Sequence, residues 1–392
     1  MLTSTASKTK RPTPKQEAQK YKTWILMSMQ LGIVVALTLF IFKRKNNLAQ
    51  MGTEEALVGK VQEIFEQIND EVEECLRYST RKEQNTAFAN IDTIEKTKPL
   101  RMTESTAVFM YEGAIGGVGE AALAKKKNAV IIKRIILKKE NKPEEEEISL
   151  KVDHKNLMKT YLSYKTKFKN QEGKEQDILW LLMEPLEHKI TVKDIDRNEE
   201  VIRTIMKDVL NGLSYLHENG IAHLDLKLAN VMGDYSEEEG RVVYKIIDFG
   251  FSRHIQADKK EKLFEGRSYG TFPYKPPEIW KKSIHGFTSD IWCLGMMGVF
   301  AANKDTTYFQ KKDAKKNENN KDTEKFKNFI EGVQRVPIYE KTSPELVDFL
   351  HRCVRRNRES RWSVEQLLAH PFIAGKKLSK EDADRVQHKY YV

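Results

Sequence analysis

The residue types between His223 and Asn230 are those needed to transfer a phosphoryl group. Asp225 is followed two positions later by Lys227 and five positions later by Asn230, and Asp248 then begins an Asp-Phe-Gly triplet. Asp225 can orient a substrate hydroxyl and accept its proton, while Lys227 can lie beside the transferred phosphate. Asn230 and Asp248 can hold Mg²⁺ ions between the phosphates of ATP. The spacing therefore predicts metal-assisted phosphoryl transfer.

A glycine-rich segment and a strand-like segment precede this loop. Residues 111–122 read YEGAIGGVGEAA, where Gly116 and Gly119 would let backbone N–H groups approach phosphate oxygens without a Cβ in the way. Residues 129–133 read AVIIK, and a lysine inside an apolar strand needs a partner for its charge. In order and spacing, these motifs and the loop resemble the catalytic core of the eukaryotic protein kinases.

The resemblance implies that Lys133 contacts the α- and β-phosphates of ATP and pairs with a glutamate of the following helix. Four consecutive glutamates are candidates for this partner. The family places an apolar residue four positions beyond the glutamate, which selects Glu146 with Leu150. Counting back nine positions from His154 selects Glu145 instead. We expect Glu146 to be the partner.

The run of apolar residues at 177–183 resembles the fifth strand of the family, which leads into the hinge. The resemblance implies that Glu184 and Leu186 belong to this hinge, where backbone groups meet the adenine of ATP. Two positions depart from the family pattern. Ala114 stands at the first glycine of the glycine-rich loop, and Leu224 replaces the arginine that usually precedes the catalytic aspartate.

The resemblance continues downstream through residues 201–219, whose periodicity predicts a helix ending at Gly220. In relatives that modify serine and threonine, the residue matching Thr271 links the catalytic aspartate and lysine. The family also supplies a buried arginine, here Arg361, as the partner of the residue matching Glu278. Asp290 is expected to accept hydrogen bonds from backbone N–H groups of the catalytic loop.

An uncharged apolar segment lies upstream of all these motifs. Residues 24–42 read WILMSMQLGIVVALTLFIF, and a helix of this length spans about 28 Å, close to the hydrocarbon core of a bilayer. A signal peptide and a buried core helix are the alternatives, but the apolar run is long for a signal peptide. We expect a single transmembrane helix, preceded by a short basic tail over residues 1–23.

The orientation of this helix is not decided by charge, because lysines and arginines flank both of its ends. The need for ATP, the three widely spaced cysteines and the lack of an Asn-x-Ser/Thr acceptor favour a catalytic region on the cytoplasmic side. The sequence therefore predicts a single-pass membrane protein whose catalytic domain faces the cytoplasm.

Residues 43–106 are predicted to form a polar stalk with one amphipathic helix. Between residues 54 and 78, apolar side chains recur at three- and four-residue steps. This stripe could form a short coiled coil that makes a homodimer, or could pack against the catalytic domain, and three heptads do not decide between them. The domain is expected over residues 107–374, with a Lys/Asn-rich surface insertion at 303–327 and a basic C-terminal tail at 375–392.

The net charge of +10 comes partly from short lysine clusters, which we interpret as solvated loops. No aromatic interleaving or nucleic-acid motif accompanies them, so no nucleic-acid partner is expected.

These observations predict an α+β fold with a β-rich small lobe and a helical large lobe, preceded by one transmembrane helix. The resemblance implies a membrane-anchored Ser/Thr protein kinase that uses ATP and Mg²⁺ and acts on hydroxyl groups of proteins. A membrane-tethered pseudokinase scaffold with little turnover is the alternative. A kinase-like enzyme acting on a small molecule or lipid is a third hypothesis. The presence of Lys133, Asp225 and Asp248 favours the active kinase.

Overall fold

The residues that the computed structural model describes all fall within the unit Phe88–Val392. The described residues are 98–112, 129–137, 144–169, 173–255, 261–263, 269–282, 284–304 and 338–390. Four predicted features lie outside them: the span at 24–42, the helix at 54–78, the segment with Gly116 and Gly119, and all but the first two residues of the insertion at 303–327. Within the described ranges, no helix is long and apolar enough to cross a bilayer.

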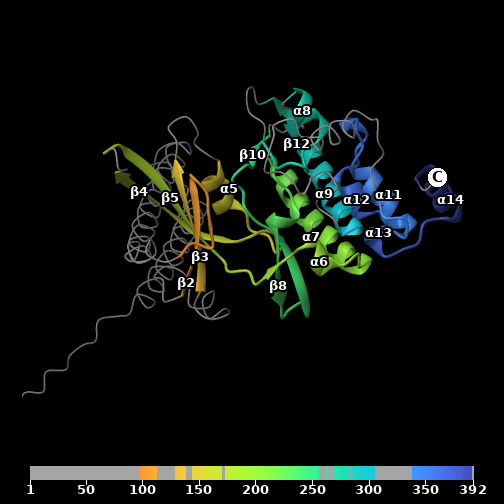
Figure 1. Cartoon of the computed structure of the whole chain (residues 1–392), viewed down its shortest axis with the longest axis horizontal. Helices are drawn as coiled ribbons and strands as arrows, with labels where there is room; N and C mark the ends of the chain where they lie inside the picture. The colour runs from red at the N-terminus through yellow and green to blue at the C-terminus, as the bar shows by residue number, and fades with distance from the viewer. Residues whose placement is uncertain are drawn as a thin grey trace, which may run out of the picture. The chain divides into compact units, whose positions relative to one another are not determined.

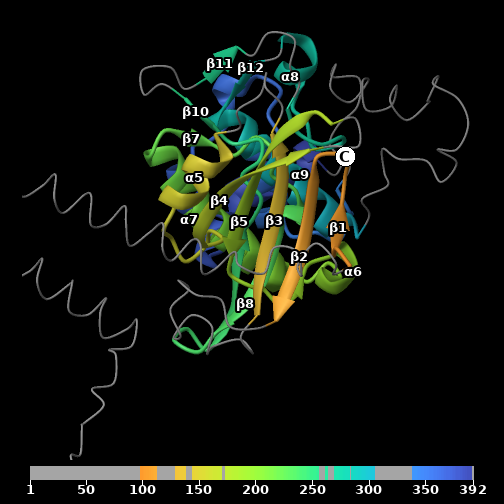
Figure 2. The ribbon, with the colours of Figure 1, turned by 90° about the vertical axis from the view of Figure 1, so that its left-hand side faces the viewer.

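A five-stranded antiparallel sheet forms one part of the unit, with its strands in the order β1–β2–β3–β5–β4 (Figure 1; Figure 2). The central strands β3 and β5 are rich in Ile and Leu, which suit a pleated and buried surface. Residues 178–183 of β5 are buried without a break, as expected for a strand covered on both faces. The strand bounds are β1 (Arg101–Met102), β2 (Thr106–Glu112), β3 (Ala129–Leu137), β4 (Thr160–Lys169) and β5 (Glu175–Met183).

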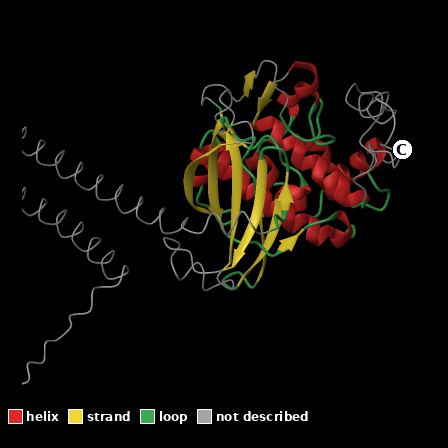
Figure 3. Ribbon diagram, turned by 60° about the vertical axis from the view of Figure 1, so that its left-hand side comes forward, coloured by secondary structure: helices red, strands yellow, loops and turns green. Residues whose placement is uncertain are grey.

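Helices make up most of the other part of the unit (Figure 3). The helix α7 (Glu199–Glu218) begins at Asn198, whose side chain accepts hydrogen bonds from two backbone N–H groups of the first turn. It ends just before Gly220, which has φ = +70°, so the predicted helix and its stop are confirmed. Apolar side chains on one face of α7 join the main core of the unit.

The helix α9 (Phe287–Asn303) is buried over most of its length and packs against both α7 and α11 (Pro344–Cys353). A Cβ at Gly295 of α9 would lie only 2.6 Å from the Cβ of Cys353. A larger residue at this position would therefore force the two helices apart. This close approach makes α9 a rigid support for the loops at its N-terminal end.

Shorter elements complete the unit. Among the described residues, the remaining helices are α5 (Glu145–Lys151), α6 (Val192–Ile195), α8 (Pro277–Lys282), α12 (Val364–Leu368), α13 (Pro371–Ala374) and α14 (Lys380–Tyr390). Two 3₁₀ turns span Leu228–Asn230 and Arg358–Ser360. The remaining strands are β6 (His188–Lys189), β7 (Ile221–Ala222), β8 (Val231–Ser236), β9 (Arg241–Ile246), β10 (Arg253–His254), β11 (Glu261–Leu263) and β12 (Ile284–Gly286). The predicted C-terminal tail contains α14, which packs on α11 and buries Val386.

A buried ion pair ties the C-terminal region to α8. Arg361 donates hydrogen bonds of 2.6 and 2.7 Å to the two carboxylate oxygens of Glu278, and both side chains are buried. A bidentate pair of this kind compensates for removing both charges from water. The predicted partnership is confirmed. The separation of a β-rich part from a helical part also fits the predicted two-lobed α+β fold (Figure 3).

Candidate active site

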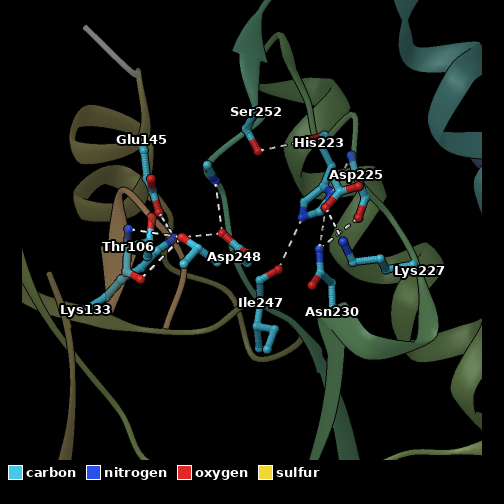
Figure 4. Close-up of polar contacts among 12 residues, drawn as sticks. Thr106, Lys133, Glu145, His223, Asp225, Lys227, Asn230, Ile247, Asp248 and Ser252 are labelled. Carbon is cyan, nitrogen blue, oxygen red and sulfur yellow. Dashed lines mark hydrogen bonds and ion pairs between the residues drawn. The ribbon is translucent and has the colours of Figure 1, made fainter. Parts of the chain in front are cut away.

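The ammonium group of Lys133 lies between two carboxylates (Figure 4). Its Nζ donates a hydrogen bond to the carboxylate of Glu145 on α5 and another, of 2.7 Å, to Oδ1 of Asp248. Burial by itself would lower the pKa of Lys133, but the two negative charges outweigh this effect and raise the pKa above its ordinary value. Lys133 is therefore a fixed positive charge at neutral pH.

The structure corrects the predicted partner of Lys133 from Glu146 to Glu145. Glu145 shares one face of α5 with the buried residues Ile148 and Ser149, whereas Leu150 is 44% exposed. The apolar residue that selected Glu146 therefore lies on the outer face of the helix. Because successive helical residues are rotated by about 100°, Glu146 points elsewhere and binds the hydroxyl of Ser163 on β4 at 2.8 Å.

Asp248 adopts φ = +69°, in the left-handed region, two residues after the end of β9. Burial raises the pKa of its carboxyl group, but the charge and hydrogen bond of Lys133, together with smaller contributions from His223 and the N–H of Gly250, outweigh this effect and hold the pKa below its ordinary value. Phe249 is buried beside the ring of His223, whose Nε2 lies 3.3 Å from the carbonyl oxygen of Ile247. His223 therefore packs against the Asp-Phe-Gly segment.

The carboxylate of Asp225 is held on several sides (Figure 4). Its Oδ1 accepts a hydrogen bond of 2.6 Å from the hydroxyl of Thr271, and its Oδ2 accepts bonds from Nζ of Lys227 at 2.6 Å and Nδ2 of Asn230 at 3.1 Å. Lys227 also donates to the Thr271 hydroxyl at 2.7 Å. The predicted link through Thr271 is therefore confirmed. These contacts fix the direction in which Asp225 presents its carboxylate.

The backbone of the catalytic loop is held by Asp290, at the start of α9. The fully buried carboxylate of Asp290 accepts hydrogen bonds of 2.8 Å from the N–H groups of His223 and Leu224 and lies 3.0 Å from Nε2 of His217. Leu224 has φ = +64°, a conformation that costs a non-glycine residue about 1–2 kcal/mol. The bonds to Asp290 offset this cost, and the predicted role of Asp290 is confirmed.

Two oxygens near this loop suit a divalent cation. Nδ2 of Asn230 donates to the backbone carbonyl of Asp225 at 2.9 Å, which turns Oδ1 of Asn230 the other way. That Oδ1 is buried and has no hydrogen-bond partner within the described residues. Magnesium is bound in many proteins by one or two such oxygens together with phosphates of the substrate. Asn230 and Asp248 therefore fit the predicted magnesium ligands.

The hinge is connected to the rest of the unit by Glu184. Its carboxylate accepts bonds of 2.7 and 2.8 Å from Nζ of Lys245 on β9 and one of 2.7 Å from the N–H of Lys159. The N–H of Glu184 donates to the carbonyl of Lys159. In the described part of the chain, the N–H of Leu186 makes no hydrogen bond. Leu186 is thus the better placed of the two predicted hinge residues to donate to a ligand.

Sequence reasoning did not identify the contacts of Lys245 with Glu184 or of His217 with Asp290. Lys245 lies 61 positions from Glu184, and His217 lies 73 positions from Asp290. Neither Lys245 nor His217 belongs to a motif that the sequence analysis identified. Gly116 and Gly119, predicted to cover the phosphates, lie outside the described residues.

Comparison with known proteins gives the family. The model of the protein kinase domain matches residues 109–373, so the chain belongs to the protein kinase family.

The chain is also similar to individual kinases. The Drosophila melanogaster "serine/threonine-protein kinase PAK mbt" is 29% identical over 67% of this chain and 38% of its own length. The Homo sapiens "serine/threonine-protein kinase PAK 4" is 29% identical over 67% of this chain and 42% of its own length. The Dictyostelium discoideum "serine/threonine-protein kinase pakH" is 32% identical over 47% of this chain and 32% of its own length. The chain spans less than half of each of these relatives.

Replacing Glu145 and Glu146 separately by glutamine tests the corrected pairing. Glu145→Gln removes a charge that holds Lys133, so we expect phosphoryl transfer from ATP to fall by about tenfold or more. Glu146→Gln is the matched control, because Glu146 contacts β4, and its activity should stay within about twofold of the unchanged protein. Initial rates of ³²P transfer measure both. A larger loss in Glu146→Gln than in Glu145→Gln would contradict the assignment.

Proposed function

We propose that this chain is a Ser/Thr protein kinase that transfers the γ-phosphoryl group of ATP to hydroxyl groups of proteins. The observation that carries the proposal is the orientation of Asp225 by Thr271, Lys227 and Asn230. A carboxylate aimed in this way can hold a substrate hydroxyl in line with a phosphate and accept its proton. Family membership supports the reaction class.

Each side chain of the site has a distinct part in the proposed reaction. Asp225 orients the acceptor hydroxyl and takes up its proton at a carboxylate oxygen. Lys227, 2.6 Å from Asp225, would neutralise charge that builds up on the transferred group. Lys133 would hold the α- and β-phosphates, since its charge is kept in place by Glu145. Asn230 and Asp248 would hold Mg²⁺, which would supply positive charge that neutralises the phosphates.

The hinge supports the use of ATP. Pro185 has no N–H, and the N–H of Glu184 is bonded to Lys159. Leu186 therefore offers the first uncommitted backbone donor after β5 within the described residues, and we propose that it binds the adenine ring. The partly buried carboxylate of Glu184 holds this segment in place through Lys245 rather than facing a ligand.

Serine and threonine are the proposed acceptors, rather than tyrosine. Thr271 bridges Asp225 and Lys227, as the resemblance implied for enzymes that modify these two residues. The names of the three relatives above all include "serine/threonine-protein kinase". The pseudokinase alternative is less well supported, because Lys133, Asp225 and Asp248 are all present and in contact with the partners that the reaction needs.

Replacing Asp225 by asparagine tests the proposed activity. Asparagine keeps the size of the side chain but cannot accept the proton, so the rate of ³²P transfer to a mixed basic protein substrate should fall at least about 100-fold. Binding of Mg-ATP should change little, because Asp225 is not expected to contact the nucleotide. Acid hydrolysis of the product should release phosphoserine and phosphothreonine. Equal labelling by the two proteins, or no labelling by the unchanged chain, would contradict the proposal.

We also propose that residues 24–42 anchor the protein in a membrane and leave the kinase domain in the cytoplasm. Residues 24–42 lie outside the described part of the chain, so the support for this proposal comes from the sequence. The segment is uncharged and is long enough to span the hydrocarbon core of a bilayer. A homodimer through residues 54–78 stays a prediction for the same reason.

Alkaline carbonate extraction of cell membranes tests the anchor. The full chain should stay in the membrane pellet, and a variant lacking residues 24–42 should move to the supernatant, because about 19 apolar residues supply the whole insertion energy. Added protease should digest the kinase domain only when the cytoplasmic face is accessible. Release of the full chain by carbonate would exclude a membrane span.

A further inference from the structure

The five-stranded sheet has two faces, and α5 packs on one of them. Ser163 on β4 binds Glu146 of α5, and Lys133 on β3 binds Glu145 of the same helix. Lys133 lies opposite Leu181 of β5, which in turn lies opposite Ser163. Directly opposed residues of antiparallel strands point to the same side, so these side chains define the face toward α5. In Figure 1, this face is turned toward the helical part of the unit.

The opposite face, termed the outer face, is apolar and buried. Phe109 on β2, Ile132 on β3 and Leu182 on β5 form one row across the strands, and each of them is at most 3% exposed. Ala107 and Trp180 belong to the next row and are also buried. The burial of β5 on both of its faces therefore has two separate sources, and α5 supplies only one of them.

The described elements do not account for the burial of the outer face. Figure 2 looks onto this face, and within the described ranges no helix or strand lies across it. The core clusters formed by the described residues include none of Phe109, Ile132, Trp180 and Leu182. The apolar face of a sheet has to be buried against another element. A segment outside the described ranges is therefore needed as the cover.

Residues 88–97 have the position and the length that this cover requires. They end directly before Lys98, after which the chain enters β1 at the edge of the sheet. The unit that contains the sheet begins at Phe88. Ten residues of helix are about 15 Å long, and the four spacings between five strands amount to about 19 Å. A segment attached at the edge of the face also has a high effective concentration over it.

The composition of this segment also suits the outer face. Phe88, Ile91 and Ile94 recur at steps of three residues, which is typical of one side of a helix. The segment has two acidic residues and one lysine, and the outer face includes the positive charge of Arg134. Met102 of β1 lies on the same face and is 66% exposed, so the face remains apolar up to the edge where the segment joins it.

We propose that residues 88–97 pack across the outer face of the sheet in the same chain, with Phe88, Ile91 and Ile94 against Ile132 and Leu182. This contact supports β3 from the side opposite α5 and so stabilises the strand that carries Lys133. The proposal does not depend on the kinase activity. Residues 54–78 and a second copy of the chain are the other possible occupants, and the experiments distinguish them.

Photo-cross-linking in the full-length chain tests the contact directly. A p-benzoylphenylalanine at position 91 should cross-link to peptides of β2, β3 or β5. The same probe at position 93 is the matched control and should do so in lower yield, because position 93 lies on another side of a helix. A mixture of isotopically light and heavy chains separates links within one chain from links between two copies. Links from position 91 only to a second copy, only to other segments, or to nothing would overturn the inference.

Charge substitutions test the same packing by thermal unfolding of the full-length chain. Ile91→Asp places a carboxylate against an apolar surface, so we expect the unfolding midpoint to fall by about 3 °C or more. Thr93→Asp adds the same charge on another side and should shift the midpoint by less than about 1 °C. An unchanged midpoint in Ile91→Asp would contradict the proposal. A fall in Ile64→Asp without one in Ile91→Asp would assign the face to residues 54–78 instead.

Discussion

The rest of the site depends on one positive charge shared by two carboxylates. Lys133 on β3 binds Glu145 on α5 and Asp248 after β9, and so joins three segments that are far apart in the sequence. Removing one member of such a buried group leaves an uncompensated charge, which costs about 3–5 kcal/mol. The sheet, the short helix and the Asp-Phe-Gly segment are therefore constrained to one arrangement.

A second constraint acts on the catalytic loop. Asp290, fixed at the start of a helix that the core surrounds, holds the backbone of His223 and Leu224 in place. Asp225 follows at once and is oriented from the other side by Thr271. The catalytic side chains thus lie on loops, but rigid helices determine where these loops lie.

Contacts within one motif could be predicted from the residues alone, whereas a contact between distant segments, such as that of Arg361 with Glu278, was predicted only through the resemblance to the family. Asp225, Lys227 and Asn230 lie within six residues, and their mutual contacts follow from local geometry. The choice between Glu145 and Glu146 could not be made in this way, because it depends on where α5 begins and hence on which face each residue occupies. The bond between Glu184 and Lys245 depends on strands brought together only by folding.

The measurement that tests the account most directly is the Mg²⁺ dependence of ATP binding, determined by calorimetry on the full-length chain. If Lys133 keeps Asp248 charged and oriented toward a metal ion, ATP should bind on the order of tenfold more tightly with Mg²⁺ than with a chelator. Asp248→Asn should lose most of this difference. Equal affinities with and without Mg²⁺ in the unchanged chain would contradict the account and favour a scaffold that does not catalyse transfer.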